Sequence, residues 1–245
     1  MLVKVAGTDV PLVSIGTSPF IGAGQFGFKG LIWRRTFLND PRRMAELMIQ
    51  GFKLGILGAH ILPVGAIPIA VKLVRDTIPD YLVIGSLMPP PDLKESLETL
   101  ISLESKIVFI HGEISDRRRK DQILSIIDII KEMGATAGVA THTYPVRTLK
   151  FLLTEGIKVP VLLPFNLHGS YMEDQPELER LVDESHLECI AMKVLDAGRL
   201  SPKNAISYVV KHNIKAITVG MTSVQELEEL SKSMVPLVNK MRRFE

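Results

Sequence analysis

The sequence has one cysteine and no long hydrophobic run, and its charges nearly cancel. With Cys189 as the only cysteine, no intramolecular disulfide can form, and its apolar neighbours predict a buried, reduced thiol. No uncharged apolar stretch reaches the roughly 18 residues that a membrane-spanning helix needs. The 29 basic residues against 27 acidic ones leave a net charge of +2, too small for the field that nucleic-acid binders usually carry.

The rest of the composition is typical of a globular protein. Hydrophobic residues make up 46% of the chain and charged residues 23%, which is enough for a large core and argues against disorder. Residues 1–20 lack the basic start and unbroken apolar stretch of a signal peptide, so we expect a cytoplasmic protein. We expect a small-molecule or phosphorylated ligand as its partner, with no nucleic acid and no membrane, and a homo-oligomer is left open.

Short apolar runs alternate with amphipathic stretches along the chain, as in βα units of a parallel sheet. Eight such runs occur, at residues 12–16, 58–62, 82–87, 107–111, 137–141, 159–166, 189–195 and 216–220. Because eight units can close a sheet and remove its edges, we predict one α/β domain over residues 1–245, a (β/α)8 TIM barrel and not an open flavodoxin-like sheet. Residues 2–5, the turn at residues 7–9 and Val10 predict an N-terminal β-hairpin that closes the barrel's bottom.

The stretches between the runs carry signals of helix starts. The clearest are Asp40-Pro41, Asp92 with Glu95, Ser201-Pro202, and Ser223 with Glu226. In the fourth stretch the isoleucines at positions 123, 126, 127 and 130 recur at helical spacing and predict one apolar stripe that faces the sheet.

Residues 17–39 lack such a pattern and contain four glycines, so we predict an irregular first loop that is a candidate lid. Within it, Gly22 to Gly27 match G-x-G-x-x-G, the glycine pattern of dinucleotide-binding turns. Because no helix is expected before Asp40, we interpret these glycines as hinges of a mobile loop.

Two later loops are candidates for binding an anion. Gly220 ends the last predicted strand, and the next helix starts at Ser223 with free backbone donors. Gly198 and Arg199 follow the seventh strand, and barrels commonly bind phosphate after strands seven and eight. The alternative is ordinary helix capping by Ser223 with Glu226.

Four histidines follow or end predicted strands, namely His60, His111, His142 and His168. Parallel strands of a barrel deliver these ends to one rim, so we predict one polar pocket that holds all four rings, with Glu113 close to it. The pocket would serve acid–base chemistry, or would hold a divalent metal such as zinc on His60, His142 and His168. Taken singly, each is an ordinary loop histidine, and His186 and His212 are expected to be solvated.

Lys193 lies inside the seventh apolar run. It either points into the barrel mouth, where burial would lower its pKa and permit a Schiff base, or turns outward to Asp196. The basic run at residues 117–120 is interpreted as the solvated first turn of the fourth helix.

Residues 191–202 (AMKVLDAGRLSP) and 217–223 (ITVGMTS) resemble the aldo/keto reductase superfamily, most closely its branch with a ferredoxin-like extension. Weaker similarity continues upstream at residues 15–17, 109–111 and 164–167. The resemblance implies a barrel that transfers hydride from NADPH to a carbonyl. It also implies dinucleotide contacts at Gly198, Arg199, Gly220, Thr222, Ser223 and Glu226.

The chain departs from that family at the catalytic positions. Of the family's Tyr acid, Lys, Asp and His, only the histidine has a counterpart, His111, and Leu230 replaces the asparagine usual for the adenine. Without a phenol near a lysine, nothing obvious protonates a developing alkoxide.

Three functional classes follow from these observations. The first is an NADP-dependent oxidoreductase of a small carbonyl or alcohol, with His111, His60 or Glu113 as the replacement acid. The second is a metal-dependent hydrolase, isomerase or lyase that uses the rim histidines. The third is a non-catalytic binder of a phosphorylated metabolite. Of these, the oxidoreductase explains the last loop and His111 with the fewest assumptions.

Overall fold

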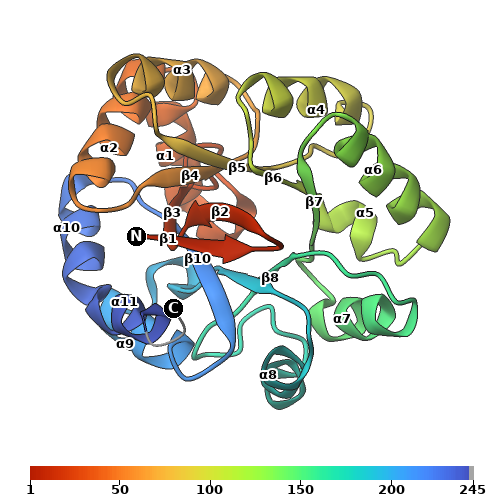
Figure 1. The fold of residues 1–245 in the computed structure, drawn as a ribbon. Helices are drawn as coiled ribbons and strands as arrows, with labels where there is room; N and C mark the ends of the chain where they lie inside the picture. Colours follow the sequence, from red (N-terminus) through yellow and green to blue (C-terminus); the bar gives the residue numbers. More distant parts are fainter. Residues whose placement is uncertain (243–245) are drawn as a thin grey trace.

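A computed structural model describes residues 1–242, which contain a closed barrel of eight parallel strands in the order β10-β3-β4-β5-β6-β7-β8-β9 (Figure 1). The strands are β3 (Val13–Gly16), β4 (Gly58–Ile61), β5 (Leu82–Ser86), β6 (Ile107–Ile110), β7 (Thr136–Ala140), β8 (Val161–Pro164), β9 (Cys189–Met192) and β10 (Ile214–Gly220). Each overlaps one of the eight predicted runs, and β10 pairs with β3 to close the ring. The predicted TIM barrel is confirmed.

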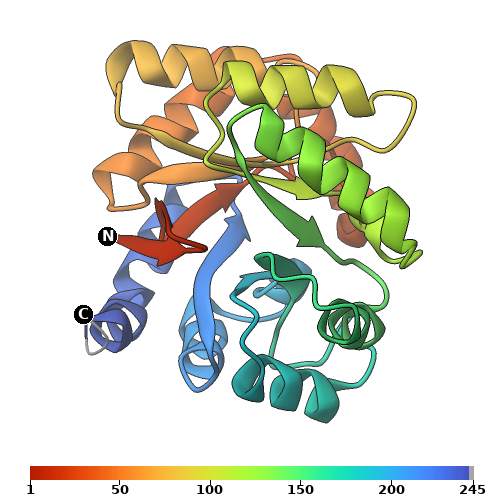
Figure 2. The ribbon, with the colours of Figure 1, turned by 45° about the vertical axis from the view of Figure 1, so that its right-hand side comes forward.

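Helices form a layer around the barrel, one after each strand (Figures 1 and 2). They are α2 (Pro41–Lys53), α3 (Ile67–Thr77), α4 (Leu93–Ser102), α6 (Lys120–Glu132), α7 (Pro145–Thr154), α8 (Gln175–Glu184), α9 (Pro202–Val209) and α10 (Val224–Ser233). The additional helical segments are η1 (Gly24–Phe26), α1 (Gly27–Phe37), α5 (Gly112–Ser115), η2 (Asp196–Gly198) and α11 (Val235–Met241). Within residues 1–242 no helix combines the length and the apolar character needed to cross a bilayer.

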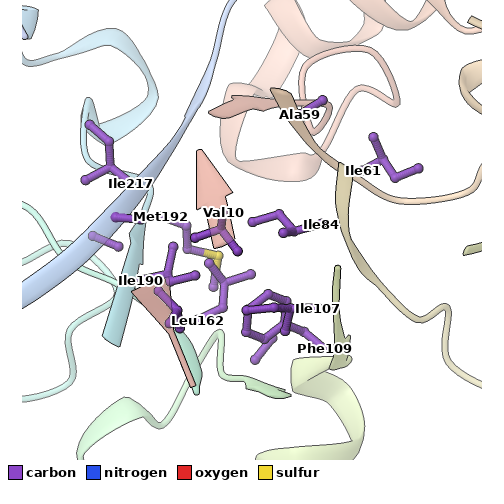
Figure 3. Packing of buried hydrophobic residues seen from close by; sticks show 14 of the residues in the cluster. Val10, Ala59, Ile61, Ile84, Ile107, Phe109, Leu162, Ile190, Met192 and Ile217 are labelled. Atoms are coloured by element: carbon purple, nitrogen blue, oxygen red, sulfur yellow. The ribbon is translucent and has the colours of Figure 1, made fainter. Parts of the chain in front are cut away.

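The predicted hairpin is confirmed as β1 (Leu2–Val5) paired antiparallel with β2 (Thr8–Pro11), and it lies over the centre of the ring (Figure 1). Val10 points into the barrel and is fully buried (Figure 3). The Thr8 hydroxyl lies 2.7 Å from the Thr136 hydroxyl on β7, which ties the hairpin to the N-terminal end of the strands. The hairpin therefore closes the bottom and leaves the opposite end for ligands.

Several of the predicted helix starts are explained by capping. The Asp40 carboxylate accepts the Arg43 N–H at 3.0 Å, and the Ser201 hydroxyl accepts the Asn204 N–H at 3.3 Å. Asp92 precedes α4 as predicted, but its side chain makes no capping bond. The isoleucine stripe of α6 is buried against the sheet, as its spacing predicts.

Buried apolar side chains from several strands pack together in the barrel (Figure 3). Phe109 is fully buried there, and a Cβ on Gly138 of β7 would lie 2.5 Å from its ring, so this glycine makes room for the phenyl group. Cys189 is buried and unpaired, and burial raises the pKa of its thiol to about 12. The prediction of a buried, reduced cysteine is confirmed.

Residues 17–39 differ from the predicted irregular loop, because they contain η1 and the eleven-residue helix α1. The helix buries only Gly30 and Phe37 and leaves Phe28, 77% exposed, on its surface, so it has no apolar stripe to reveal it. Gly22 packs on this helix: a Cβ there would lie 2.6 Å from the Gly30 carbonyl oxygen. The expectation that no helix follows Gly22 to Gly27 is therefore wrong, and Gly22 allows a close approach of loop and helix.

Six of the eight strands end earlier than predicted, β8 and β9 by two and three residues and the other four by one. Strand β8 stops at Pro164, and β9 stops at Met192 because the backbone of Lys193 turns into the left-handed region, at a φ of 56°. His111 and Lys193, which the predicted runs include, therefore lie just beyond the strand ends, as His142 and His168 also do.

Candidate functional site

A cavity of about 610 Å³ opens at the C-terminal ends of the strands, where barrels carry their ligand sites. One part of its lining is polar and comes from four strands or the loops that follow them: His60, His111, His142 and Lys193. Another part comes from the segments at and after the ends of β9 and β10, including Gly198, Gly220, Thr222 and, in the first turn of α10, Glu226. Phe26 and Trp33, from η1 and α1, complete the wall, so residues 17–39 do border the site.

His60 is a buried histidine and the last residue but one of β4. Its Nε2 lies 2.9 Å from the Ser86 hydroxyl on β5, and its ring meets the Phe109 ring edge-on with centroids 6.2 Å apart. Burial lowers the pKa of His60 to about 4, with a smaller contribution from His111. The ring is therefore neutral at pH 7, and one of its nitrogens is already engaged.

The tautomer of His111 follows from its role as the cap of α5. Its Nδ1 accepts the backbone N–H of Glu113 at 3.2 Å, so the neutral ring carries its proton on Nε2. Burial lowers the pKa of His111, while Glu113 and Asp116 oppose that shift. Because His111 lines the cavity, it can present an N–H donor to a ligand.

His142 packs against His111, with ring centroids 4.9 Å apart. Burial lowers the pKa of His142 to about 3, aided by the nearby His111, Lys193 and His60. Its Nδ1 is buried and has no hydrogen-bond partner among residues 1–242. A buried polar atom without a partner is costly, so this nitrogen fits a ligand that supplies one.

Asp116 holds the loop that carries His142. One carboxylate oxygen accepts the backbone N–H groups of His142 and Thr143 at 3.0 and 2.9 Å, and the other accepts the hydroxyls of Thr141 and Thr148. Nothing in the local sequence marks Asp116 as such a support, because its partners come from the next βα unit.

Lys193 projects into the cavity from its left-handed position after β9. Its Nζ lies 3.9 Å from the centroid of the Tyr171 ring, and it forms no ion pair within the described part of the chain. Burial lowers the pKa of Lys193 to about 8, with Asp116 opposing the shift. Of the two orientations that the sequence left open, the structure has the inward one.

Asp196 does not pair with Lys193, because two other side chains occupy it. His168 Nδ1 lies 2.8 Å from one carboxylate oxygen, and Arg199 binds both oxygens at 2.6 and 2.8 Å. The Arg199 guanidinium, and to a lesser degree His168, hold the pKa of Asp196 far below its usual range. Neither His168 nor Arg199 is part of the cavity lining among residues 1–242.

The predicted cluster of four histidines is therefore only partly assembled. His60, His111 and His142 line one cavity, whereas His168 is held by Asp196. Within residues 1–242, Glu113 is not among the residues that line the cavity. Its carboxylate pairs with Arg117 at 3.2 Å, and only its backbone N–H contacts His111. His212, expected to be solvated, bonds Asp183 at 2.9 Å and packs on Phe165.

The three histidines predicted as metal ligands do not form a set of ligands in the structure. No group of three His, Cys, Asp or Glu side chains within residues 1–242 is arranged to hold a metal ion. The predicted combination of His60, His142 and His168 is not brought together, because Asp196 engages the third ring.

The loop after β10 differs from a free anion site. Ser223 caps α10 as predicted, accepting the Glu226 N–H at 3.2 Å, and it does not line the cavity described for residues 1–242. The Glu226 carboxylate accepts the Thr222 backbone N–H at 2.7 Å and the Thr222 hydroxyl at 3.0 Å. Donors that the sequence left free for an anionic ligand are thus used by a carboxylate of the chain itself.

The buried histidines make the stability depend on pH. In the unfolded chain His60 and His142 take up protons near their ordinary value of 6.5, but in the folded protein they remain neutral down to about 4 and about 3. Their contribution to stability is fully present above pH 6.5 and is lost as the pH falls toward 4, at up to about 1.4 kcal/mol per pH unit for each ring.

We therefore expect the free energy of unfolding, measured by urea titration between about pH 4.5 and 7, to fall less steeply in His142→Gln than in the unsubstituted protein. Exposed His186→Gln is the control and should keep the original slope. Equal slopes for His142→Gln and the unsubstituted protein would mean that this ring is not held neutral by the fold.

Comparisons with known proteins support the fold but do not assign a family or a function. No protein-family model and no curated protein matches the sequence. Among solved structures, a putative aldo-keto reductase from Pseudomonas aeruginosa is 17% identical with a TM-score of 0.66, covering 95% of this chain and 94% of that one. An aldo/keto reductase from Klebsiella pneumoniae, in complex with NADP and acetate, is 14% identical with a TM-score of 0.60 over 96% of this chain and 92% of that one.

A barrel with another activity has the same TM-score as the Klebsiella pneumoniae structure. A truncated 3-deoxy-D-arabino-heptulosonate 7-phosphate synthase from Thermotoga maritima is 10% identical, with a TM-score of 0.60 over 98% of this chain and 93% of that one. The likeness therefore identifies a TIM barrel that resembles aldo/keto reductases in structure, and the function has to be argued from the cavity.

Proposed function

We propose that this protein is an oxidoreductase that transfers a hydride between a nicotinamide dinucleotide and a small carbonyl or alcohol. The observation that carries the proposal is one cavity that combines a neutral imidazole N–H and a lysine ammonium with the glycine-containing loops after β9 and β10. The resemblance implies NADP as the dinucleotide, and the similar K. pneumoniae structure is described with NADP.

The cavity fits such a cofactor in its size and in its unpaired polar atoms. Its volume of about 610 Å³ lies within the usual range for ligand pockets. Thr218 Oγ1 on β10 is buried and without a partner among residues 1–242, as is His142 Nδ1. Both residues line the cavity, and a bound carboxamide or substrate oxygen would provide the missing partners.

The residues divide the work of carbonyl reduction as follows. When bound, a dihydronicotinamide supplies the hydride. The His111 Nε2–H donates a hydrogen bond to the substrate oxygen and polarises the carbonyl. Lys193, charged below its pKa of about 8, supplies the proton that the oxygen takes up as it becomes an alkoxide. In the direction of alcohol oxidation, neutral Lys193 accepts that proton.

This assignment departs from the three replacement acids expected from the sequence, which were His111, His60 and Glu113. His60 is engaged with Ser86, and the Glu113 carboxylate pairs with Arg117. A neutral His111 is a hydrogen-bond donor rather than a proton source, since losing its proton would leave an imidazolate. Lys193 is therefore the group that replaces the missing phenol.

The proposal is tested by turnover of the reduced dinucleotides with a panel of small aldehydes and ketones, followed by loss of dihydronicotinamide absorbance. We expect substrate-dependent oxidation of NADH or NADPH by the purified protein, and the reverse reaction with the corresponding alcohols. If the cofactor binds but is not oxidised with any member of the panel, a non-catalytic binder is favoured. If neither dinucleotide binds, the proposal of a nicotinamide-dependent oxidoreductase is wrong.

A further inference from the structure

We infer that the cofactor form this cavity selects is the unphosphorylated one, NAD(H), and that Glu226 and Glu229 of α10 determine the selection. This inference rests on the proposed function and changes the cofactor that the resemblance implies. It concerns the second nucleotide of the cofactor, away from the reacting carbon.

The orientation of a dinucleotide follows from where hydride transfer must occur. The nicotinamide has to lie beside His111 and Lys193, because these are the groups able to act on a carbonyl oxygen. The other nucleotide must then extend along the cavity toward the remaining part of its lining, which includes Gly220, Thr222, Glu226 and Glu229. The unpartnered hydroxyl of buried Thr218 lies on β10, the strand that leads into this loop, and independently indicates that the cavity receives a polar ligand.

Carboxylates and not cations line that far part. Among residues 1–242, Lys193 is the one lysine or arginine that lines the cavity. The carboxylate that counteracts the lowering of its pKa is Asp116, not Glu226. Arg199, the basic residue expected to contact a phosphate, has both ends of its guanidinium on Asp196. A 2′-phosphate in this part of the cavity would therefore face two carboxylates. Within residues 1–242, the lining offers it no lysine or arginine apart from Lys193 at the other end.

The Glu226 carboxylate is also held in a position suited to a ribose diol. Its Oε2 accepts both the N–H and the hydroxyl of Thr222, which removes two donors that a phosphate could use. Its Oε1 accepts no hydrogen bond from the described residues, so it can accept from a ribose hydroxyl. An acidic side chain that bonds the 2′-hydroxyl is the general device by which sites choose NAD over its 2′-phosphorylated form.

The test compares dissociation constants of NADH and NADPH, measured by fluorescence titration at fixed ionic strength. We expect NADH to bind about 100-fold more tightly, because like charges that face each other in a site penalise the wrong ligand strongly. Glu226→Gln keeps the acceptor for Thr222 and removes the charge, so it should improve NADPH binding about tenfold and weaken NADH only slightly. Glu229→Gln should act in the same direction. Glu228→Gln is the control, because Glu228 is exposed on the same helix outside the cavity lining described for residues 1–242.

The outcomes separate the two claims. NADPH binding as tightly as NADH, or an unchanged ratio in both Glu226→Gln and Glu229→Gln, would overturn the selection by these carboxylates while leaving the oxidoreductase proposal intact. No binding of either dinucleotide at millimolar concentration would overturn the proposed function and the inference together.

Discussion

Lys193→Met should lower kcat for carbonyl reduction by about 100- to 10,000-fold, the usual contribution of a positioned proton donor. The loss should fall on kcat more than on the dissociation constant of the cofactor, because Lys193 acts on the substrate oxygen. His111→Phe should cost about 100- to 1,000-fold, the effect of removing one donor to a developing oxyanion. Both are measured by steady-state kinetics with the best carbonyl substrate of the panel.

Two comparisons distinguish proton transfer by Lys193 from a general effect of charge. Lys193→Arg keeps the charge but cannot release its proton near neutral pH, so it should not restore the rate. In the unsubstituted protein, reduction should slow above pH 8 as Lys193 with its pKa of about 8 loses its proton, whereas alcohol oxidation should rise toward that pH. Lys203→Met, at an exposed site on α9, is the control. A full rate in Lys193→Met would exclude the lysine as the acid.

Phe109→Ala should destabilise the protein by about 3 to 5 kcal/mol, because it empties space in the barrel interior that the fixed strands cannot fill. The Phe109 ring is fully buried (Figure 3), packs against the position of Gly138 and meets the ring of His60 edge-on. The loss is measured as the change in the free energy of unfolding from urea titration. Phe28→Ala makes the same substitution at a side chain that is 77% exposed and should stay within about 0.5 kcal/mol. Equal effects at the two positions would contradict the packing described here.

The barrel could be predicted because its signals are local and repeat along the chain. Each strand buries both faces and so reads as an apolar run, and the stripe of α6 gives its helix and its buried face together. Helix α1 could not be predicted in this way, because it lacks such a signal. Its apolar side chains Phe28, Leu31 and Ile32 are exposed, so they form no buried stripe at helical spacing.

The candidate site was predicted only as far as strand ends determine it. Strand ends brought His60, His111 and His142 to one cavity, but they could not show that Asp196 holds His168 and Arg199, since those contacts depend on the course of the loops. Lys193 enters the cavity because of a left-handed backbone angle that no residue pattern encodes. Thr218 had a weak signal, as a polar residue inside the last apolar run.

Energy transfer from Trp33 to a bound dihydronicotinamide shows directly whether this barrel holds a dinucleotide. Trp33 is the only tryptophan of the chain and lines the cavity, so its emission reports on occupancy of this site. Titration with NADH should quench Trp33 and sensitise cofactor emission in a saturable way at micromolar concentrations, a binding free energy of about 8 kcal/mol. Trp33→Phe should remove the transferred signal without abolishing binding measured by calorimetry. A titration that shows no transfer and no heat of binding up to millimolar NADH would contradict a dinucleotide site in this barrel.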